Sequence, residues 1–224
     1  MFQIEQVSIL IVSLIIIMFI FWLKGQFKAI DQGQKQPSKI IVTVISYVQM
    51  IDNLVKGSMG PAYTPKMSAY IGTIFIYIFI SNISGLFAIN NPTGNLSVTL
   101  TLAIITWILV ERTKFKSKGI KGFIKSFFEP FPFFVIPNLF SEVAPLVSLS
   151  MRLFGNILSG SIIMGLFYVF TAWLASFIPV VGHFNFIGAV LAPVLHAYFD
   201  LFAGFLQSFI FITLTTVLIA VEHD

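Results

Sequence analysis

The stretch Ser150-Met-Arg-Leu-Phe-Gly-Asn-Ile-Leu-Ser-Gly160 places a single arginine, Arg152, inside a long apolar run. From Ser126 to Asp224 the chain has no other lysine or arginine. A guanidinium stays protonated at physiological pH, and at the centre of a bilayer it costs from about 3 to over 10 kcal/mol. A charge of that cost inside an apolar run indicates a functional position.

The composition is that of an integral membrane protein. Of 224 residues, 57% are hydrophobic and only 10% are charged, and the mean hydropathy is +0.95. So much apolar surface exceeds what one soluble core buries. Runs long enough to cross about 30 Å of hydrocarbon recur along the chain, and helices satisfy their own backbone hydrogen bonds there. The sequence therefore predicts an all-α integral membrane protein with a single membrane domain, residues 1–224.

The positive charges are concentrated in two patches. Twelve of the thirteen Lys and Arg residues lie either between Lys24 and Lys66 or between Arg112 and Lys125, and the thirteenth is Arg152. The positive-inside rule assigns both patches to the cytoplasmic face. Membrane topology therefore accounts for the net charge of +4 without a nucleic-acid partner.

Five helices are predicted to cross the membrane, with the N-terminus outside and the C-terminus in the cytoplasm. Their ranges are 7–23, 68–89, 96–110, 141–177 and 186–221. The last two each run for about 36 residues, or about 54 Å, against about 30 Å of hydrocarbon. We expect them to be steeply tilted and to form an antiparallel hairpin with a turn at 178–184.

The remaining segments are predicted to lie at the cytoplasmic surface. Residues 40–55 are apolar but shorter than a span, with basic residues at both ends, which favours a surface amphipathic helix over a re-entrant segment. Three prolines between 123 and 140 predict a kinked segment that leads into the next span. The domain thus divides into 1–67, a two-span hairpin at 68–112, a basic loop and Pro-rich segment at 113–140, and the long hairpin at 141–224.

A simple rule predicts which residues of the long hairpin lie at the same depth. If the turn is near residue 180, residues whose numbers sum to about 360 are level. The rule pairs Arg152 with Gln207, Ser161 with Asp200, and Glu142 with Leu218. At 100° per residue, His196, Asp200 and Gln207 lie within about 40° of one another on one helix face. A polar stripe inside the membrane indicates an ion pathway.

Arg152 and Asp200 receive different predicted roles. Arg152 cannot release its proton, so it would attract a partner's carboxylate and block direct leakage between two aqueous paths. Ser148, Asn156 and Ser159 share its helix face. Asp200 is a candidate proton carrier. The structural alternatives are an ion pair between Arg152 and Asp200, or a buried Asp200 that is merely capped by neighbours.

The other titratable groups offer fewer functions. Glu142 is predicted at the cytoplasmic mouth as a solvated acid with a conduction role. His196 either assists the proton path or packs as a polar side chain. The chain has no cysteine, its three histidines lack metal-ligand spacing, and no phosphate loop or catalytic triad is found. We therefore expect no metal, no cofactor and no enzymatic activity of this chain by itself.

Several motifs identify a resemblance to a known family. They are Ser81-Asn-Ile-Ser-Gly-Leu86, Asn91-Pro-Thr-Gly-Asn-Leu-Ser-Val-Thr-Leu100, Asn138-Leu-Phe-Ser-Glu142, Ser148-Leu-Ser-Met-Arg-Leu-Phe-Gly-Asn156 and Leu206-Gln-Ser-Phe-Ile-Phe211. With them the chain strongly resembles subunit a of the F-type rotary ATP synthases, in its bacterial or chloroplast form. The Arg-Leu-Phe-Gly-Asn stretch is highly specific.

The resemblance implies a stator that conducts ions, expected to be protons, in a bacterial plasma membrane. It implies that Arg152 is the family's indispensable arginine, with Gln207 and Asn156 beside it. An ion would enter near Asp200, ride on carboxylates of a c-subunit ring, and leave near Glu142. The implied partners are the c ring, the b subunits, the soluble ATPase sector and the lipid bilayer.

One departure from the family pattern concerns Ser161 and Asp200. Many bacterial relatives carry a glutamate at the position of Ser161 and a histidine at that of Asp200. Since the depth rule sets these positions opposite each other, the acid has moved across the helix pair. A secondary transporter or an anion channel that binds a small anion at Arg152 is the alternative function, and a purely structural membrane anchor is a third.

Overall fold

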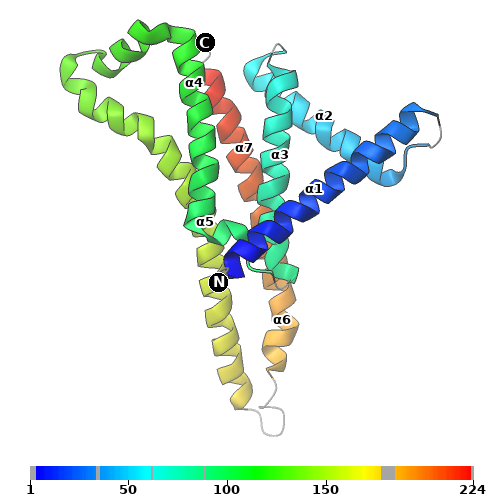
Figure 1. Cartoon of the computed structure of the whole chain (residues 1–224). Helices are drawn as coiled ribbons and strands as arrows, with labels where there is room; N and C mark the ends of the chain where they lie inside the picture. Colours follow the sequence, from blue (N-terminus) through cyan, green and yellow to red (C-terminus); the bar gives the residue numbers. More distant parts are fainter. Residues whose placement is uncertain (1–3, 34–35, 62, 88, 178–184, 223–224) are drawn as a thin grey trace.

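The computed structural model describes residues 4–33, 36–61, 63–87, 89–177 and 185–222, and every regular element in these ranges is helical (Figure 1). Six helices are long and apolar enough to cross a membrane. They cover Gln6–Asp31, Lys39–Met59, Thr64–Phe87, Leu96–Phe128, Pro132–Ser176 and Phe186–Val221. The predicted class of all-α membrane protein is confirmed. The predicted turn at 178–184 and the histidines His183 and His223 lie outside the described residues.

The first two helices are α1 (Ile4–Asp31) and α2 (Lys39–Met59). α2 begins after Ser38, whose hydroxyl accepts a hydrogen bond from Ile41 N at 3.5 Å, and ends at Gly60 with a φ of 80°. Its 21 residues are enough for a span, so the length argument against a crossing was wrong. The surface orientation of α2 stays a prediction.

α2 is attached to α3 (Thr64–Ile83) by a hydrogen bond at a close approach of the two helices. The Tyr47 hydroxyl donates to the carbonyl oxygen of Gly72 at 2.7 Å. A Cβ added at Gly72 would lie 3.3 Å from that hydroxyl, so the small residue allows the contact. Two short 3₁₀ turns, η1 (Ser84–Phe87) and η2 (Pro92–Gly94), then lead to the next helix.

α4 (Leu96–Phe128) extends far beyond the span predicted at 96–110. The segment from 113 to 128, predicted as a basic loop, is helical and changes direction at Gly119, which has a φ of 67°. That backbone conformation favours glycine, so the sequence marks the kink but not the helix around it. The Pro-rich region is as expected: a break at 129–131, the 3₁₀ turn η3 (Pro132–Phe134), and then a long helix.

The long hairpin is present, and its second arm contains a π-helical segment. α5 (Val135–Ser176) has 42 residues, with Pro137 in its first turn, where no backbone donor is needed. The other arm consists of α6 (Phe186–His196), the π-helical segment η4 (Ala197–Phe202) and α7 (Ala203–Val221). The two arms run antiparallel in Figure 1. π-helical segments occur frequently at functional sites.

α7 lies between α3 and α4 in Figure 1, and it also contacts α2 and α5. In the most apolar windows of α3 and of the α6–α7 arm, 44% of residues are buried, against 17% in each other candidate span. The core cluster joins Ile51 of α2, Ile78 of α3, Leu153 of α5 and Phe211 of α7. This pair of buried helices holds α5 in place, while much of the apolar surface of α5 stays exposed.

Candidate ion-translocation site

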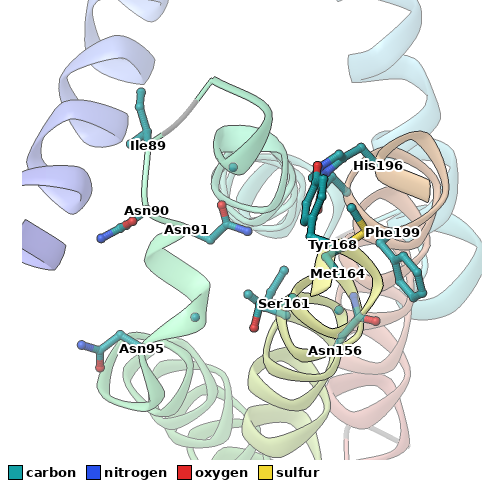
Figure 2. A pocket seen from close by; sticks show the side chains of 16 residues that line it. Ile89, Asn90, Asn91, Asn95, Asn156, Ser161, Met164, Tyr168, His196 and Phe199 are labelled. Atoms are coloured by element: carbon teal, nitrogen blue, oxygen red, sulfur yellow. The ribbon is translucent and has the colours of Figure 1, made fainter. Parts of the chain in front are cut away.

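A polar cavity of about 530 Å³ lies between the long hairpin and the connection from α3 to α4 (Figure 2). We call it the outer cavity. Its polar lining side chains come from three places: Asn90, Asn91 and Asn95 from the connection, Asn156, Ser161 and Tyr168 from α5, and His196 and Asp200 from the other arm. Of the predicted site residues, four are therefore brought together here: Asn156, Ser161, His196 and Asp200.

Three titratable side chains form a hydrogen-bonded chain in the outer cavity. The Tyr168 hydroxyl lies 3.1 Å from His196 Nε2, and His196 Nδ1 lies 2.6 Å from Asp200 Oδ2. In the tautomer in which His196 Nδ1 donates to Asp200, His196 Nε2 accepts from the Tyr168 hydroxyl. The Asp200 side chain retains 18% exposure. The chain can therefore hold a proton and exchange it with the cavity.

Two of the three pairs predicted for the hairpin agree with the structure. Ser161 and Asp200 line the same cavity, and Glu142 and Leu218 line a second one. A Cβ added at Gly160 would lie 3.8 Å from Phe199 Cδ1, so these two positions also face each other. The sum of 360 therefore describes the pairing of the two arms.

The prediction that His196, Asp200 and Gln207 share one face of the last helix is wrong for Gln207. The prediction assumed 100° per residue from His196 to Gln207, but the π-helical segment η4 lies between them and turns less per residue. Gln207 is only 7% exposed, is not among the residues that line the outer cavity, and its Nε2 atom has no hydrogen-bond partner in the described part of the chain. Gln207 therefore faces the bundle interior.

The side chain of Arg152 is exposed on α5. Its Nη2 atom donates to Ser148 Oγ at 3.4 Å, which agrees with the predicted shared face. Across the described ranges, Arg152 takes part in none of the ion pairs, and the partner of Asp200 is His196. The structural alternative of an Arg152–Asp200 ion pair is therefore not formed.

A second cavity, of about 240 Å³, is lined by Glu142 from α5 and Glu222 from the end of the other arm. We call it the inner cavity. Glu142 forms an ion pair with Lys114 of α4, and Lys118, one turn later, pairs with Glu222 at 2.9 Å. The side chains of Lys114 and Glu142 are only 6% and 18% exposed. Glu142 is therefore a paired, largely buried acid, and the prediction of a solvated one was wrong.

The kink in α4 explains how a lysine can be buried beside Glu142. After Gly119 the helix turns, and the rings of Phe123 and Phe127 come within 5.6 and 5.5 Å of Lys114 Nζ. These rings and the carboxylate of Glu142 together offset the loss of water around the ammonium group. Trp107 Nε1 also donates to the backbone oxygen of Glu142 at 2.9 Å and fixes this part of α5.

A buried polar network fixes the wall of the outer cavity to the π-helical arm. Asn82 Nδ2 donates to the carbonyl oxygen of Gly204 at 3.1 Å, and Thr93 Oγ1 donates to Asn82 Oδ1 at 2.7 Å. Ser84 Oγ donates to Asn91 Oδ1 at 3.2 Å. The Ser81–Leu86 and Asn91–Leu100 motifs therefore position the connection beside the segment that carries Asp200.

Sequence reasoning missed Tyr168 and Lys114. Tyr168 lies seven residues after Ser161 on α5. The residue numbers of Tyr168 and His196 sum to 364, close to the 360 of the depth rule, so that rule could have found it. Lys114 was counted only as part of a basic patch. Nothing in its sequence context distinguishes it from its exposed neighbours, because the kink that buries it is a tertiary feature.

Loss of the Lys114–Glu142 ion pair is expected to destabilise the fold. Lys114→Met leaves the carboxylate of Glu142 buried without its cation, and this should lower the free energy of unfolding by about 3 to 5 kcal/mol. Unfolding of the full chain in mixed detergent micelles measures this change. The exposed Lys121→Met is the matched control, with a change below about 0.5 kcal/mol. Adding Glu142→Gln to Lys114→Met should restore most of the loss, and an additive double variant would contradict the pair.

The fold and the two cavities define a multi-pass helical membrane protein in which two separate cavities lie along one helix hairpin. The chain belongs to the ATP synthase A chain family, whose sequence profile matches residues 6–220. The resemblance noted from the motifs is thereby confirmed, and the family forms the ion-translocating part of the ATP synthase membrane sector.

Individual relatives align over nearly the whole chain. The chain is 33% identical to a protein of Propionigenium modestum named "ATP synthase subunit a, sodium ion specific", over 95% of this chain and 71% of the relative. It is 30% identical to the ATP synthase subunit a of Bacillus pumilus, over 98% of this chain and 91% of the relative. The identity to the Bacillus subtilis subunit is also 30%, over 100% and 94%.

Proposed function

We propose that this chain is the stationary ion-conducting subunit of an F-type ATP synthase, with two half-paths separated by Arg152. The observation that carries the proposal is the presence of two cavities with no lining residue in common, one around Asp200 and one around Glu142. Along α5, Arg152 lies between Glu142 and Ser161, which belong to different cavities. An ion crosses only if a partner carries it past the arginine.

The outer half-path delivers the ion to Asp200. Amide side chains of the α3–α4 connection and of Asn156 line the approach and can hydrogen-bond water. Asp200 and His196 then exchange the ion with a carboxylate of a partner ring. The His196–Asp200 pair is partly buried, with side-chain exposures of 33% and 18%, so it is accessible from the cavity yet shielded from bulk water.

Arg152 separates the half-paths by charge. Met151 and Leu158 are 54% and 44% exposed and lie on one stripe of α5 about 100° around the helix from Arg152, so an apolar surface that a membrane partner can cover borders the polar face of the arginine. In the described part of the chain its charge is not neutralised by any carboxylate. It therefore attracts an ionised carboxylate of the ring, and because it keeps its own proton it cannot pass one on.

The inner half-path begins at Glu142 and leads to the cytoplasm. Lys114 holds this carboxylate, and Glu111 of α4 interacts with it as well. Two carboxyl groups beside one ammonium can share a proton. A proton released by the ring has an acceptor here, next to the inner cavity.

The transported ion is proposed to be H⁺. The Tyr168–His196–Asp200 chain supports this choice, because an imidazole exchanges protons near neutral pH, whereas hard alkali cations take oxygen ligands. The Propionigenium modestum relative is named as sodium ion specific, so Na⁺ is the competing cation. Each charge that crosses releases about 2.3 kcal/mol per 100 mV, which summed over several ions can drive ATP formation.

The proposed setting is a bacterial plasma membrane, with the N-terminus outside and the C-terminus in the cytoplasm. The start of α3 and the basic part of α4 lie at the same end of the molecule as the end of α7, opposite the end of α5 and the start of α6 (Figure 1). That arrangement agrees with the positive-inside rule. The proposed partners are the c ring, the b subunits and the soluble ATPase sector.

Reconstitution into liposomes separates this proposal from its rivals. Under an imposed membrane potential, the chain alone should transport neither protons nor small anions, and proton flux should appear when it is assembled with its ring. Flux of an anion through the chain alone would favour the transporter or channel that uses Arg152 as an anion site. No proton flux in the verified assembly would favour a structural anchor.

A further inference from the structure

A third cavity, of about 380 Å³, lies between the start of α3 and the middle of α4, and it shares no lining residue with the outer or inner cavity. Its lining includes three cations: Lys66, Arg112 and Lys116. All three side chains are exposed, and within the described ranges none of them forms an ion pair. No carboxylate appears among the described residues that line it, so the charged side chains of its lining are all positive.

Neighbouring backbone and hydroxyl groups add to the anion-binding character. Lys66 lies in the first turn of α3, which contains no acidic residue, and the start of a 20-residue helix carries a partial positive charge. Ser117 contributes an exposed hydroxyl to the lining. An arginine, two lysines and a hydroxyl donor are the groups that bind phosphate oxygens in proteins.

One wall of the cavity is apolar. Met67 and Leu109 line it, both are partly buried, and Met67 packs against the core cluster. Both helices also qualify as membrane spans, so the cavity lies beside the basic segments of two apolar helices. A free phosphate ion makes no use of such a wall, whereas the glycerol and upper acyl carbons of a lipid would pack against it.

We infer that this cavity binds the headgroup of an anionic glycerophospholipid, with the phosphate held by Lys66, Arg112 and Lys116. Basic pockets between membrane helices at the cytoplasmic side suit such headgroups. A zwitterionic lipid fits less well, because its ammonium group would meet three cations and no lining carboxylate. The site is separate from the proposed ion path, so a test of lipid binding here does not depend on whether the proposed function is correct.

The test compares lipids and variants on the purified full chain. Native mass spectrometry from detergent measures retention of phosphatidylglycerol and of phosphatidylcholine at equal concentrations. The wild type should retain phosphatidylglycerol with roughly 10-fold to 100-fold preference. Lys66→Gln/Arg112→Gln/Lys116→Gln should remove that preference, and Arg112→Gln alone should reduce it. Lys24→Gln/Lys28→Gln/Lys39→Gln, which removes as many charges elsewhere, should keep it.

Three results would overturn the inference. Equal retention of the two lipids by the wild type would exclude a headgroup-selective site. Equal loss in both triple variants would reduce the effect to general surface charge. Displacement of the lipid by millimolar inorganic phosphate would assign the cavity to a free anion. Thermal unfolding of each variant in the same detergent verifies that the chain is folded, and Arg112→Gln supplies the comparison if the triple variant is not.

Discussion

Arg152→Ala is expected to abolish ATP-driven proton pumping by the assembled complex in membrane vesicles. The guanidinium is the single permanent cation between Ser126 and Asp224, and no carboxylate in the described chain neutralises it. Without it, the ring carboxylate loses the charge that keeps it ionised as it passes between the half-paths. The outer and inner cavities would then be able to exchange protons directly, so passive leak should rise as pumping falls to background.

The comparison for Arg152→Ala needs a variant with the same loss of charge outside the hairpin. Lys24→Ala removes one exposed cation near the end of the first span and should pump as the wild type does. Immunoblots of the purified complex establish that each variant assembles with its ring. Normal pumping by an assembled Arg152→Ala complex would disprove the proposed role of the arginine and favour a structural anchor.

Asp200→Asn is expected to slow proton flux through the assembled complex by about 10-fold to 100-fold. Asparagine preserves the size of the side chain and can still hydrogen-bond His196, but it cannot carry a proton at any accessible pH. The outer cavity would keep its shape, so assembly should be normal and the loss should appear in the rate of flux. Unchanged flux would transfer the acceptor role to His196 or to water in the cavity.

A second substitution tests whether the outer cavity needs an acid at one position or only within the same space. Ser161 and Asp200 line that cavity from opposite arms of the hairpin. Ser161→Glu in the Asp200→Asn background should therefore recover a substantial part of the flux. No recovery in an assembled complex would mean that the pairing of the carboxylate with His196, seen at 2.6 Å, is itself required.

Much of the hairpin was predictable because it depends on simple chain geometry. Two apolar segments of nearly equal length, joined by a short connection, have a register fixed by the position of that connection in the sequence. This is why Ser161 with Asp200, and Glu142 with Leu218, share cavities as predicted. The prediction from helix geometry was wrong for Gln207, because the π-helical segment η4 changes the rotation per residue. No residue in that segment predicts a π-helix.

Glu142 lines one cavity with Leu218 as predicted, but its environment differs from the prediction. Glu142 was predicted to be solvated because it lies near the end of the hairpin. Instead it pairs with Lys114, a residue 28 positions earlier in the chain. It depends on the kink at Gly119, which returns two phenylalanine rings to the lysine. The number of lysines and arginines in a basic patch predicts which side of the membrane the patch lies on. It does not predict which of those lysines is buried.

The sequence alone determined the class of protein, the long hairpin and the exceptional position of Arg152, because hydropathy and the cost of a buried charge are properties of local composition. Only the tertiary structure decided how the polar groups are partitioned. Tyr168, His196 and Asp200 form a hydrogen-bonded chain in one cavity. Glu142 pairs with Lys114 beside another cavity, and Gln207 is buried in the bundle interior. Those outcomes depend on helix packing, a kink and a π-helical turn, which bring together residues far apart in the chain.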